Sequence, residues 1–142
     1  MGFQKDYEIW MQRQIAEEKN HRRKEILSKG LSYGSVEFLR LAWHPAIGNF
    51  DCLHSEWEVR DLHNKIRYLD FAYLPGKVKG NIEIQDYATH ARDLDLARFK
   101  DLCRRQSLLS LDDWIYFPIA YMSIRDEPEL CKQQLSHCAR CL

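Results

Sequence analysis

Two acidic residues interrupt apolar, strand-like segments of this sequence. Asp70 lies within the run Ile66 to Tyr73, and Glu83 lies between two isoleucines in residues 81–85. A charged side chain in a buried strand is costly unless another group neutralises it. Carboxylate oxygens are the ligands that Mg²⁺ and Mn²⁺ prefer in proteins. The sequence therefore predicts a divalent cation held between Asp70 and Glu83.

Three neighbouring strands are predicted to position these acids. Side chains two residues apart share one face of a strand. The connection at residues 75–80 contains Pro and Gly, which predicts a hairpin that places Asp70 beside Glu83. Glu56 and Glu58 share one face of an earlier predicted strand. We therefore expect four acids to line one groove.

The composition is that of one folded domain with balanced charge. The 142 residues suffice for a single core, and 45% hydrophobic and 12% aromatic residues argue against a disordered chain. Lys plus Arg and Asp plus Glu both number 21, so the formal net charge is zero. A neutral protein has no strong overall field that attracts nucleic acid or membrane. Affinity for DNA must then come from local basic patches and a bound cation.

The sequence lacks the signals of a membrane or secreted protein. It has no apolar run of about 18 residues, and its N-terminal stretch lacks the apolar centre of a signal peptide. Asp6 replaces the Ser or Thr of an N-terminal acylation signal. Five cysteines, an odd number, indicate reduced thiols. We expect a soluble cytoplasmic protein that does not contact membranes.

Residues 1–30 are predicted to form a long amphipathic N-terminal helix. Its apolar stripe at helical spacing consists of Phe3, Tyr7, Trp10, Met11, Gln14 and Ile15. This stripe either docks on the rest of the chain or pairs with a second copy in a homodimer. Arg22, Arg23 and Lys24 either contact DNA phosphates or form a solvated helix face, since nearby glutamates dilute their charge.

The rest of the chain predicts an α+β protein. The expected elements are a helix over 35–43, the three strands, a helix over 93–106, a strand over 114–118 and a short helix over 127–135. Pro45 is expected to end the first of these helices. Glu37 lies in its first turn, where the helix dipole favours an acid.

The order of these elements and their motifs resembles the PD-(D/E)XK nuclease fold. More narrowly, the chain is similar to uncharacterised bacterial domains related to the very-short-patch repair endonuclease. The matching residues are Leu69-Asp70-Phe71-Ala72 for the acid and aromatic strand, Ile82-Glu83-Ile84-Gln85 for the second acidic motif, His90 for a histidine after it, Asp95, Arg98 and Leu102 for the start of the following helix, and Glu37 for an acid on the early helix. The resemblance covers residues 33–125.

This resemblance implies three regions. Residues 1–30 form an N-terminal arm, and residues 31–125 form a restriction-endonuclease-like core of a helix, three antiparallel strands, a helix and a strand. Residues 126–142 form a short C-terminal helix or tail, and the chain is expected to be a truncated form of a longer protein.

The resemblance also implies metal-dependent hydrolysis of phosphodiester bonds in DNA. Asp70 and Glu83 are then direct ligands of Mg²⁺ or Mn²⁺, with the carbonyl of Ile84 as a third ligand. The metal ion makes the attacking water more acidic and neutralises charge on the phosphoryl oxygens. The supporting residues are Glu37, Glu58 and Arg98.

Gln85 departs from the family pattern, which has a lysine at this position. A lysine supplies positive charge beside the attacking water, whereas an amide orients that water without neutralising charge. His90 is a candidate proton-transfer group, because the pKa of histidine lies near neutrality. Its alternative role is a backbone-bonded histidine at the start of a helix.

Two further clusters have alternative interpretations. A zinc site is one reading of the C-terminal set Cys131, His137, Cys138 and Cys141. Its single close cysteine pair lies at the chain end, where fraying is expected. The aromatic stretch is Trp43, His44, Pro45, Phe50 and Trp57. These residues either stack on bases or pack in the core.

Three functions compete at this point. The first is a metal-dependent endonuclease or nickase acting on DNA. The second is a catalytically weak relative that binds DNA or regulates transcription. The third is a non-enzymatic interaction domain, which the amphipathic N-terminal helix favours.

Overall fold

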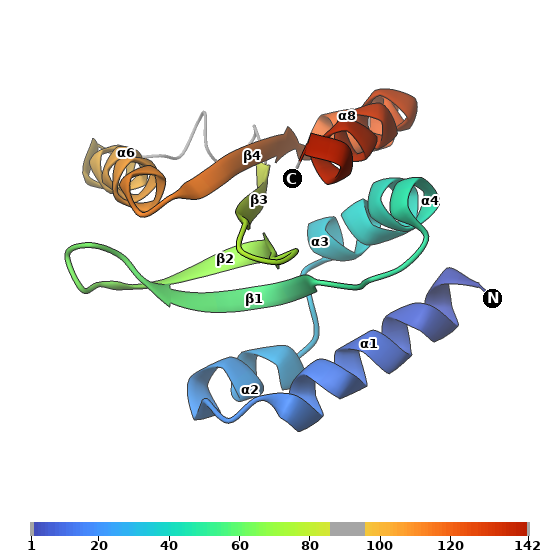
Figure 1. Ribbon diagram of the computed structural model, residues 1–142, viewed down its shortest axis with the longest axis horizontal. Helices are drawn as coiled ribbons and strands as arrows, with labels where there is room; N and C mark the ends of the chain where they lie inside the picture. Colours follow the sequence, from blue (N-terminus) through green and yellow to red (C-terminus); the bar gives the residue numbers. More distant parts are fainter. Residues whose placement is uncertain (1, 86–95, 142) are drawn as a thin grey trace.

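A four-stranded mixed sheet forms the centre of this α+β protein, and helices flank it (Figure 1). The computed structural model describes residues 2–85 and 96–141. The strands are β1 (Leu53–Arg60), β2 (Ile66–Tyr73), β3 (Lys79–Gln85) and β4 (Trp114–Ala120), in the order β1-β2-β3-β4. The first two pairings are antiparallel, and β4 runs parallel to β3. The predicted α+β class is thus confirmed.

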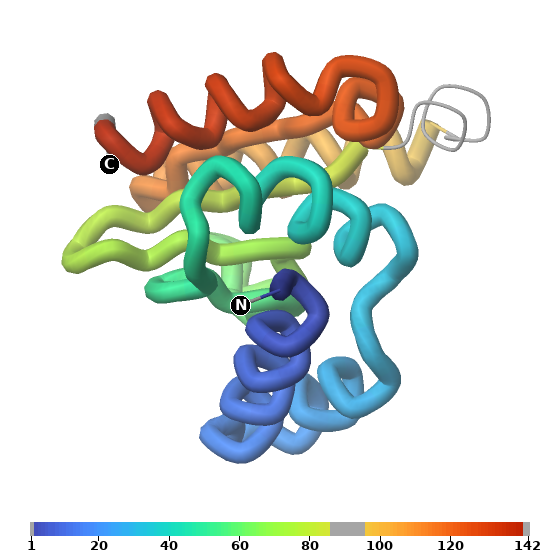
Figure 2. The backbone as a smooth tube through the Cα atoms, turned by 90° about the vertical axis from the view of Figure 1, so that its right-hand side faces the viewer, coloured from blue at the N-terminus to red at the C-terminus, as the bar shows by residue number. Residues whose placement is uncertain are grey.

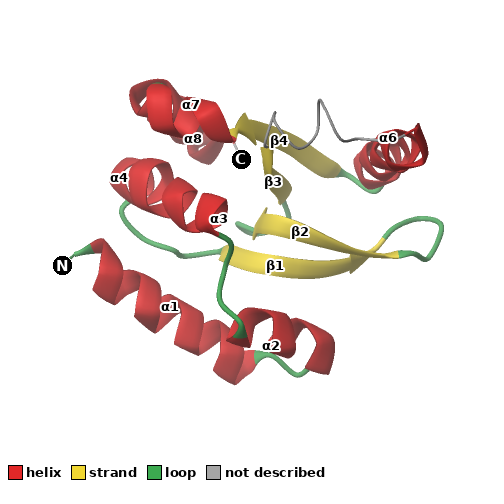
Figure 3. Cartoon of the chain, turned by 180° about the vertical axis from the view of Figure 1, so that it is seen from behind, coloured by secondary structure: helices red, strands yellow, loops and turns green. Residues whose placement is uncertain are grey.

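The sheet opens between its second and third strands. Seven register pairs join β1 to β2 and seven join β3 to β4, but only three join β2 to β3. The last of these three is Phe71 with Ile82. Figure 3 shows the two halves of the sheet diverging beyond this pairing. The next opposed residues are Asp70 and Glu83, so both predicted site acids lie at the opening.

Two helices, rather than one, occupy the N-terminal region. They are α1 (Phe3–Glu17) and α2 (His21–Ser28). The prediction of one continuous helix over 1–30 is therefore wrong. Asn20 causes the break, because its side chain accepts hydrogen bonds from the backbone N–H groups of Arg22 and Arg23 and caps α2.

The helices α1 and α2 cover the free edge of β1, beneath which they lie in Figure 1. Trp10 Nε1 donates to the carbonyl of Leu53 at 2.9 Å. Ser55 N donates to Gln14 Oε1 at 2.8 Å, and Arg23 Nη2 donates to the carbonyl of Ser55 at 2.9 Å. An edge strand with unpaired backbone groups invites pairing with other chains. Here side chains of the N-terminal helices satisfy those groups.

The helix before the sheet runs from Tyr33 to Ile47 in three segments. These are α3 (Tyr33–Phe38), the π-helical η1 (Leu39–Trp43) and α4 (His44–Ile47). Ser32 caps the start through its side chain, three residues earlier than Ser35. Pro45 does not end the helix, contrary to expectation; it follows directly on the π-helical η1, whose wider turn precedes it. The chain instead leaves the helix at Gly48, whose φ is 89°.

The C-terminal part contains α6 (Leu96–Leu111), α7 (Tyr121–Asp126) and α8 (Pro128–Cys141). The short helix predicted over 127–135 is present as the longer α8. Cys131 and Leu135 are 1% and 0% exposed and belong to the main hydrophobic core. Figure 2 shows α8 running beside the η1 and α4 segments, which it contacts.

Two hydrophobic clusters lie on either side of the sheet. The larger cluster joins Phe71 and Ile82 of the sheet to residues of α1, η1, α7 and α8. The smaller cluster joins Leu69, Ala72 and Trp114 to Leu109 of α6. Helices therefore flank both faces. Among the residues that the structure describes, no helix combines the length and the apolar character needed to cross a bilayer.

Candidate functional site

Three acids lie in one row across the sheet, and we call Glu56, Asp70 and Glu83 the acid row. The register pairs on either side place Glu56 opposite Asp70 on β1 and β2. The last pair of β2 and β3 makes Glu83 the next residue opposite Asp70. The predicted neighbourhood of Asp70 and Glu83 is therefore present in the structure.

The strands are irregular where the acid row crosses them. Glu56 has a φ of 47°, which is uncommon for a residue with a side chain. Leu69 packs in the smaller cluster, whereas Phe71, two residues on, packs in the larger one. Residues two apart normally share a face. The alternation of faces is therefore interrupted at Asp70, and this interruption turns its carboxylate into the opening of the sheet.

Side chains replace backbone pairing at the opening. The backbone N–H of Asp70 donates to Glu83 Oε2 at 2.9 Å, and the backbone N–H of Ile84 donates to Asp70 Oδ2 at 2.9 Å. Each carboxylate thus binds the strand that carries the other. The two carboxyl groups also lie within hydrogen-bonding reach of each other. They are close enough to share one proton or one cation.

The Glu83 carboxyl is the most perturbed acid of the row. It is 6% exposed, and its pKa rises to about 7. Burial is the main cause and the negative charge of Asp70 the second, while the nearby Arg105 opposes both. Burial and Asp70 likewise raise the pKa of Glu56. Burial and the charge of Asp70 thus raise the pKa of both glutamates of this row.

Arg105 of α6 belongs to the site, although the sequence analysis did not single it out. Its Nη2 contacts Glu83 Oε1 and donates to the carbonyl of Tyr68 at 2.9 Å. A helical pattern was available as a signal, because Leu108 and Leu109 follow it at i+3 and i+4 and are buried. A basic residue on the inward face of a helix indicates an acid beneath it.

Gln85 points toward the α6 side of β3. Its Nε2 lies 3.2 Å from the hydroxyl of Tyr116, which Gln106 Nε2 also approaches at 3.1 Å. Burial and the charge of Glu83 raise the pKa of Tyr116. The Gln85 amide is therefore held by a neighbouring strand and helix.

A cavity of about 350 Å³ opens beside Asp70, and we call it the Tyr33 cavity. Its lining consists of Ser32, Tyr33, Gly34, Ser35, Asp70, Ile84 and Tyr121. The cavity lies between the start of α3, the end of β3 and the start of α7. A ligand in it would meet the Asp70 carboxylate directly.

The supporting acids have other partners. Glu37 is 8% exposed and accepts from Arg40 Nη2 at 2.5 Å. Glu58 accepts from Arg22 Nη2 at 2.9 Å and from the Tyr68 hydroxyl at 2.6 Å. These contacts, Arg22 first, lower the pKa of Glu58 to about 2. Glu58 therefore forms its own ion pair, and the predicted groove of four acids is reduced to the row of three.

The predicted phosphate-binding patch is only partly exposed. Arg23 is 5% exposed and donates to Gln14 Oε1 and to the carbonyls of Ser55 and Glu56. Its proposed contact with DNA is therefore corrected to a structural role at the edge of β1. Arg22 and Lys24 are exposed, and Arg22 is paired with Glu58.

The remaining predicted positions are Arg98, His90, Asp95 and the suggested zinc ligands. Arg98 lies on an exposed part of α6. His90 and Asp95 lie outside the described residues. Of the suggested zinc ligands, Cys131 is buried in the core, and His137 Nδ1 lies 2.8 Å from Arg140 Nη2. Among the described residues there is no group of three or more His, Cys, Asp or Glu side chains that could hold a metal ion.

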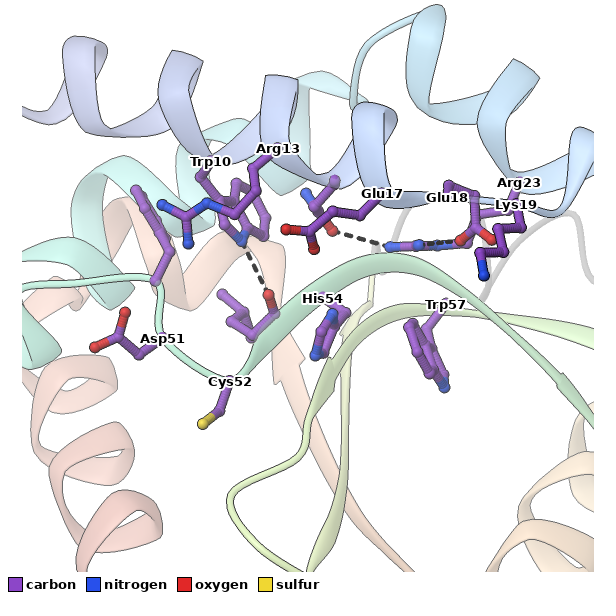
Figure 4. Close-up of a pocket in the computed structure, with 13 residues that line it drawn as sticks. Trp10, Arg13, Glu17, Glu18, Lys19, Arg23, Asp51, Cys52, His54 and Trp57 are labelled. Carbon is purple, nitrogen blue, oxygen red and sulfur yellow. Dashed lines mark hydrogen bonds and ion pairs between the residues drawn. The ribbon is translucent and has the colours of Figure 1, made fainter.

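A second cavity, of about 480 Å³, lies between α1 and β1 (Figure 4). His54 and Trp57 form one of its walls, with ring centroids 4.7 Å apart, and Arg23 lies 4.9 Å from the centroid of the Trp57 ring. Burial lowers the pKa of His54. Phe50 stacks on Trp10 at 4.8 Å within the core. The aromatic stretch thus packs mainly inside the protein.

Comparisons of the chain with protein-family models, with curated proteins and with solved structures found no match. The class of this protein therefore follows from its own structure. It is an α+β protein whose mixed sheet carries an acid row where its two halves diverge.

Proposed function

We propose that this protein is a metal-dependent nuclease that hydrolyses phosphodiester bonds in DNA. The observation that carries the proposal is the meeting of the Asp70 and Glu83 carboxylates at the opening between β2 and β3. A substrate phosphate brought to this opening would meet both acids at once. The proposed cofactor is Mg²⁺ or Mn²⁺.

The residues present fit such an ion. Both acids offer hard oxygen ligands, which Mg²⁺ prefers, and one or two carboxylates with substrate phosphate and water complete its shell. Burial raises the pKa of Glu83 first, and the neighbouring charge of Asp70 raises it further. A cation between the two carboxylates would favour the ionised form of Glu83.

The order of elements supports the restriction-endonuclease-like core proposed for residues 31–125. A helix precedes three antiparallel strands, and α6 and the parallel β4 follow them. This is the order that the resemblance implies. Asp70 and Glu83 lie on the second and third strands, as the acids of that pattern do.

Each residue has a distinct role in the proposed reaction. Asp70 and Glu83 would hold the ion, which when bound lowers the pKa of a water and neutralises phosphoryl charge. Arg105 contacts Glu83 and supplies the positive charge that Gln85 lacks. Gln85, held by Tyr116, orients groups through its amide.

Cleavage of supercoiled plasmid DNA tests this function. With Mg²⁺ or Mn²⁺, the protein should produce nicked or linear DNA, and EDTA should prevent it. Asp70→Asn and Glu83→Gln should each lower the rate at least about 100-fold, because each removes a preorganised charge from the site. Glu58→Gln is the matched control, because that acid is already paired with Arg22. Wild-type protein that binds neither ion in calorimetry would refute the proposal.

The bonding of Gln85 favours a second candidate, a DNA-binding protein without efficient cleavage. Its amide nitrogen lies against the Tyr116 hydroxyl, and no lysine stands at this position. Metal binding and DNA binding without cleavage would select this candidate over the nuclease.

A further inference from the structure

We infer that the Tyr33 cavity receives an unpaired base of the DNA substrate, stacked against the Tyr33 ring, and that the neighbouring phosphate lies at Asp70 only when the proposed metal ion is bound there. The inference rests on the proposed function, whose substrate it narrows to DNA containing unpaired nucleotides. It concerns residues that the acid row and the metal ion do not use.

The first observation is an exposed aromatic ring at the mouth of this cavity. Tyr33 is 72% exposed, a large value for an aromatic side chain. It lines the same cavity as Asp70, and Tyr121 of α7 lines it too. Nucleobases stack on exposed aromatic rings with little sequence preference, because every base has a π-face. The cavity thus joins a stacking surface to a carboxylate of the acid row.

The second observation is that a buried acid lies beside the exposed ring. The Glu37 carboxylate is close enough to the Tyr33 hydroxyl to raise the pKa of the phenol. Glu37 is itself buried and paired with Arg40. A surface that is ordered before binding loses less entropy when a ligand arrives. Glu37, predicted as a supporting acid, thereby acts as a positioning residue for the ring.

The third observation is the space that Gly34 leaves open. A Cβ at Gly34 would lie 3.5 Å from Tyr121 Cδ1 and 3.9 Å from Ile84 Cγ2. A methyl group here would therefore fill part of the cavity at ordinary contact distances. The glycine maintains room beside the rings of Tyr33 and Tyr121.

The chemistry of the lining selects a base over a phosphate. Apart from Asp70, the described lining residues are uncharged, and several carry hydroxyl groups. Hydroxyls can donate to or accept from base edges. A carboxylate without a cation repels a phosphate. Bases inside a duplex are stacked and cannot enter such a cavity unless they are extruded.

Fluorescence anisotropy with labelled oligodeoxynucleotides in EDTA tests the inference without any cleavage. The probes are a single strand, the blunt duplex of the same sequence, and the single strand with abasic sites. The wild-type protein should bind the single strand at least about tenfold more tightly than the other two, the range expected for one stacked base. Equal affinity for single strand and duplex, or for intact and abasic strands, would overturn the inference.

Variants locate the effect. Tyr33→Ala should weaken single-strand binding about tenfold, whereas Tyr33→Phe should retain most of it, because the ring does the stacking. Phe99→Ala is the matched control, an aromatic residue of α6 that is 52% exposed and outside the cavity lining. Tyr33→Ala binding as tightly as the wild type, or Phe99→Ala losing as much, would refute the role of this cavity.

Glu37→Ala tests the positioning role, because it removes the oxygen atoms that face the Tyr33 hydroxyl. It should weaken single-strand binding but leave duplex binding unchanged, because only the order of the Tyr33 ring is lost. Two results for the wild-type protein separate this inference from the proposed function. Preference for single strands without plasmid cleavage would refute only the proposed nuclease activity. Plasmid cleavage without preference for single strands would refute only the proposed base site.

Discussion

Glu83 has the ionisable side chain on which the chemistry of the site depends. It accepts from the backbone N–H of Asp70, contacts Arg105 and lies beside a second carboxylate. Without a divalent cation, burial and the neighbouring charge of Asp70 outweigh the N–H of Asp70 and Arg105 and leave Glu83 protonated over part of the neutral range, since its pKa is about 7. A bound cation would favour the ionised form instead. The proton and the cation therefore compete for the same pair of carboxylates.

Glu83→Gln tests this ionisation through stability. The pKa of Glu83 is raised from 4.5 to about 7 in the folded state, so the folded protein binds more protons than the unfolded chain between these values. The stability that this proton contributes is full below pH 4.5 and is lost as pH rises toward 7. Without metal, wild-type protein should therefore lose up to about 3 kcal/mol relative to Glu83→Gln across this window. Urea unfolding at several pH values measures it.

Glu58→Gln is a control in which the pH dependence of stability has the opposite sign. The pKa of Glu58 is lowered from 4.5 to about 2, so its contribution is present above pH 4.5 and is lost as pH falls toward 2. A wild-type minus Glu83→Gln difference that is flat with pH would contradict the raised pKa of Glu83.

At the scale of elements, α1 and α2 complete the sheet by side-chain bonding to its edge. Gln14 bonds to both the backbone N–H and the hydroxyl of Ser55, while Arg23 covers the next carbonyls. The apolar stripe of α1 also packs into the main core through Trp10 and Met11. These residues of the stripe are buried within one chain, so α1 has less apolar surface for the homodimer contact predicted from the sequence.

Gln14→Ala tests the edge cover. This side chain is 7% exposed, and its loss leaves the Ser55 N–H and part of Arg23 without partners. We expect a loss of about 1–3 kcal/mol in the free energy of unfolding, the cost of unsatisfied buried groups. Chemical denaturation measures it. Gln12→Ala, on an exposed position of the same helix, should change stability by less than about 0.5 kcal/mol. Equal effects of the two substitutions would show that Gln14 has no special role.

At the scale of the whole molecule, the C-terminal helix closes the main core. Leu135 and Cys131 of α8 pack with residues of α1, η1 and the sheet that lie far away in the sequence. The same packing places α7, and with it Tyr121, at the Tyr33 cavity. The geometry of the proposed base site therefore depends on the last helix of the described chain.

Leu135→Ala measures this closure. The side chain is 0% exposed, so its truncation should cost about 2–5 kcal/mol in the free energy of unfolding. Thermal or urea unfolding followed by circular dichroism gives the value. Leu130→Ala is the control on the same helix, where the side chain is 52% exposed and little change is expected. A Leu135→Ala variant as stable as the control would mean that α8 does not contribute to the core.

The sequence by itself determined the local features of this protein. Alternation and turn residues predicted β2 with its observed bounds, Ile66–Tyr73, and the opposition of Asp70 and Glu83 followed from the hairpin. The α+β class followed from the order of the elements. These features depend on residues close together in the chain, so short-range patterns suffice to find them.

Only the tertiary structure decided the rest. The contact of Arg105 with Glu83, the burial of Arg23 against β1 and the place of Leu135 in the core all join residues more than 20 positions apart. The interruption at Asp70 likewise depends on how both halves of the sheet pack against different helices. A local pattern specifies which face a side chain takes, but the partner on that face is chosen by packing of the whole chain.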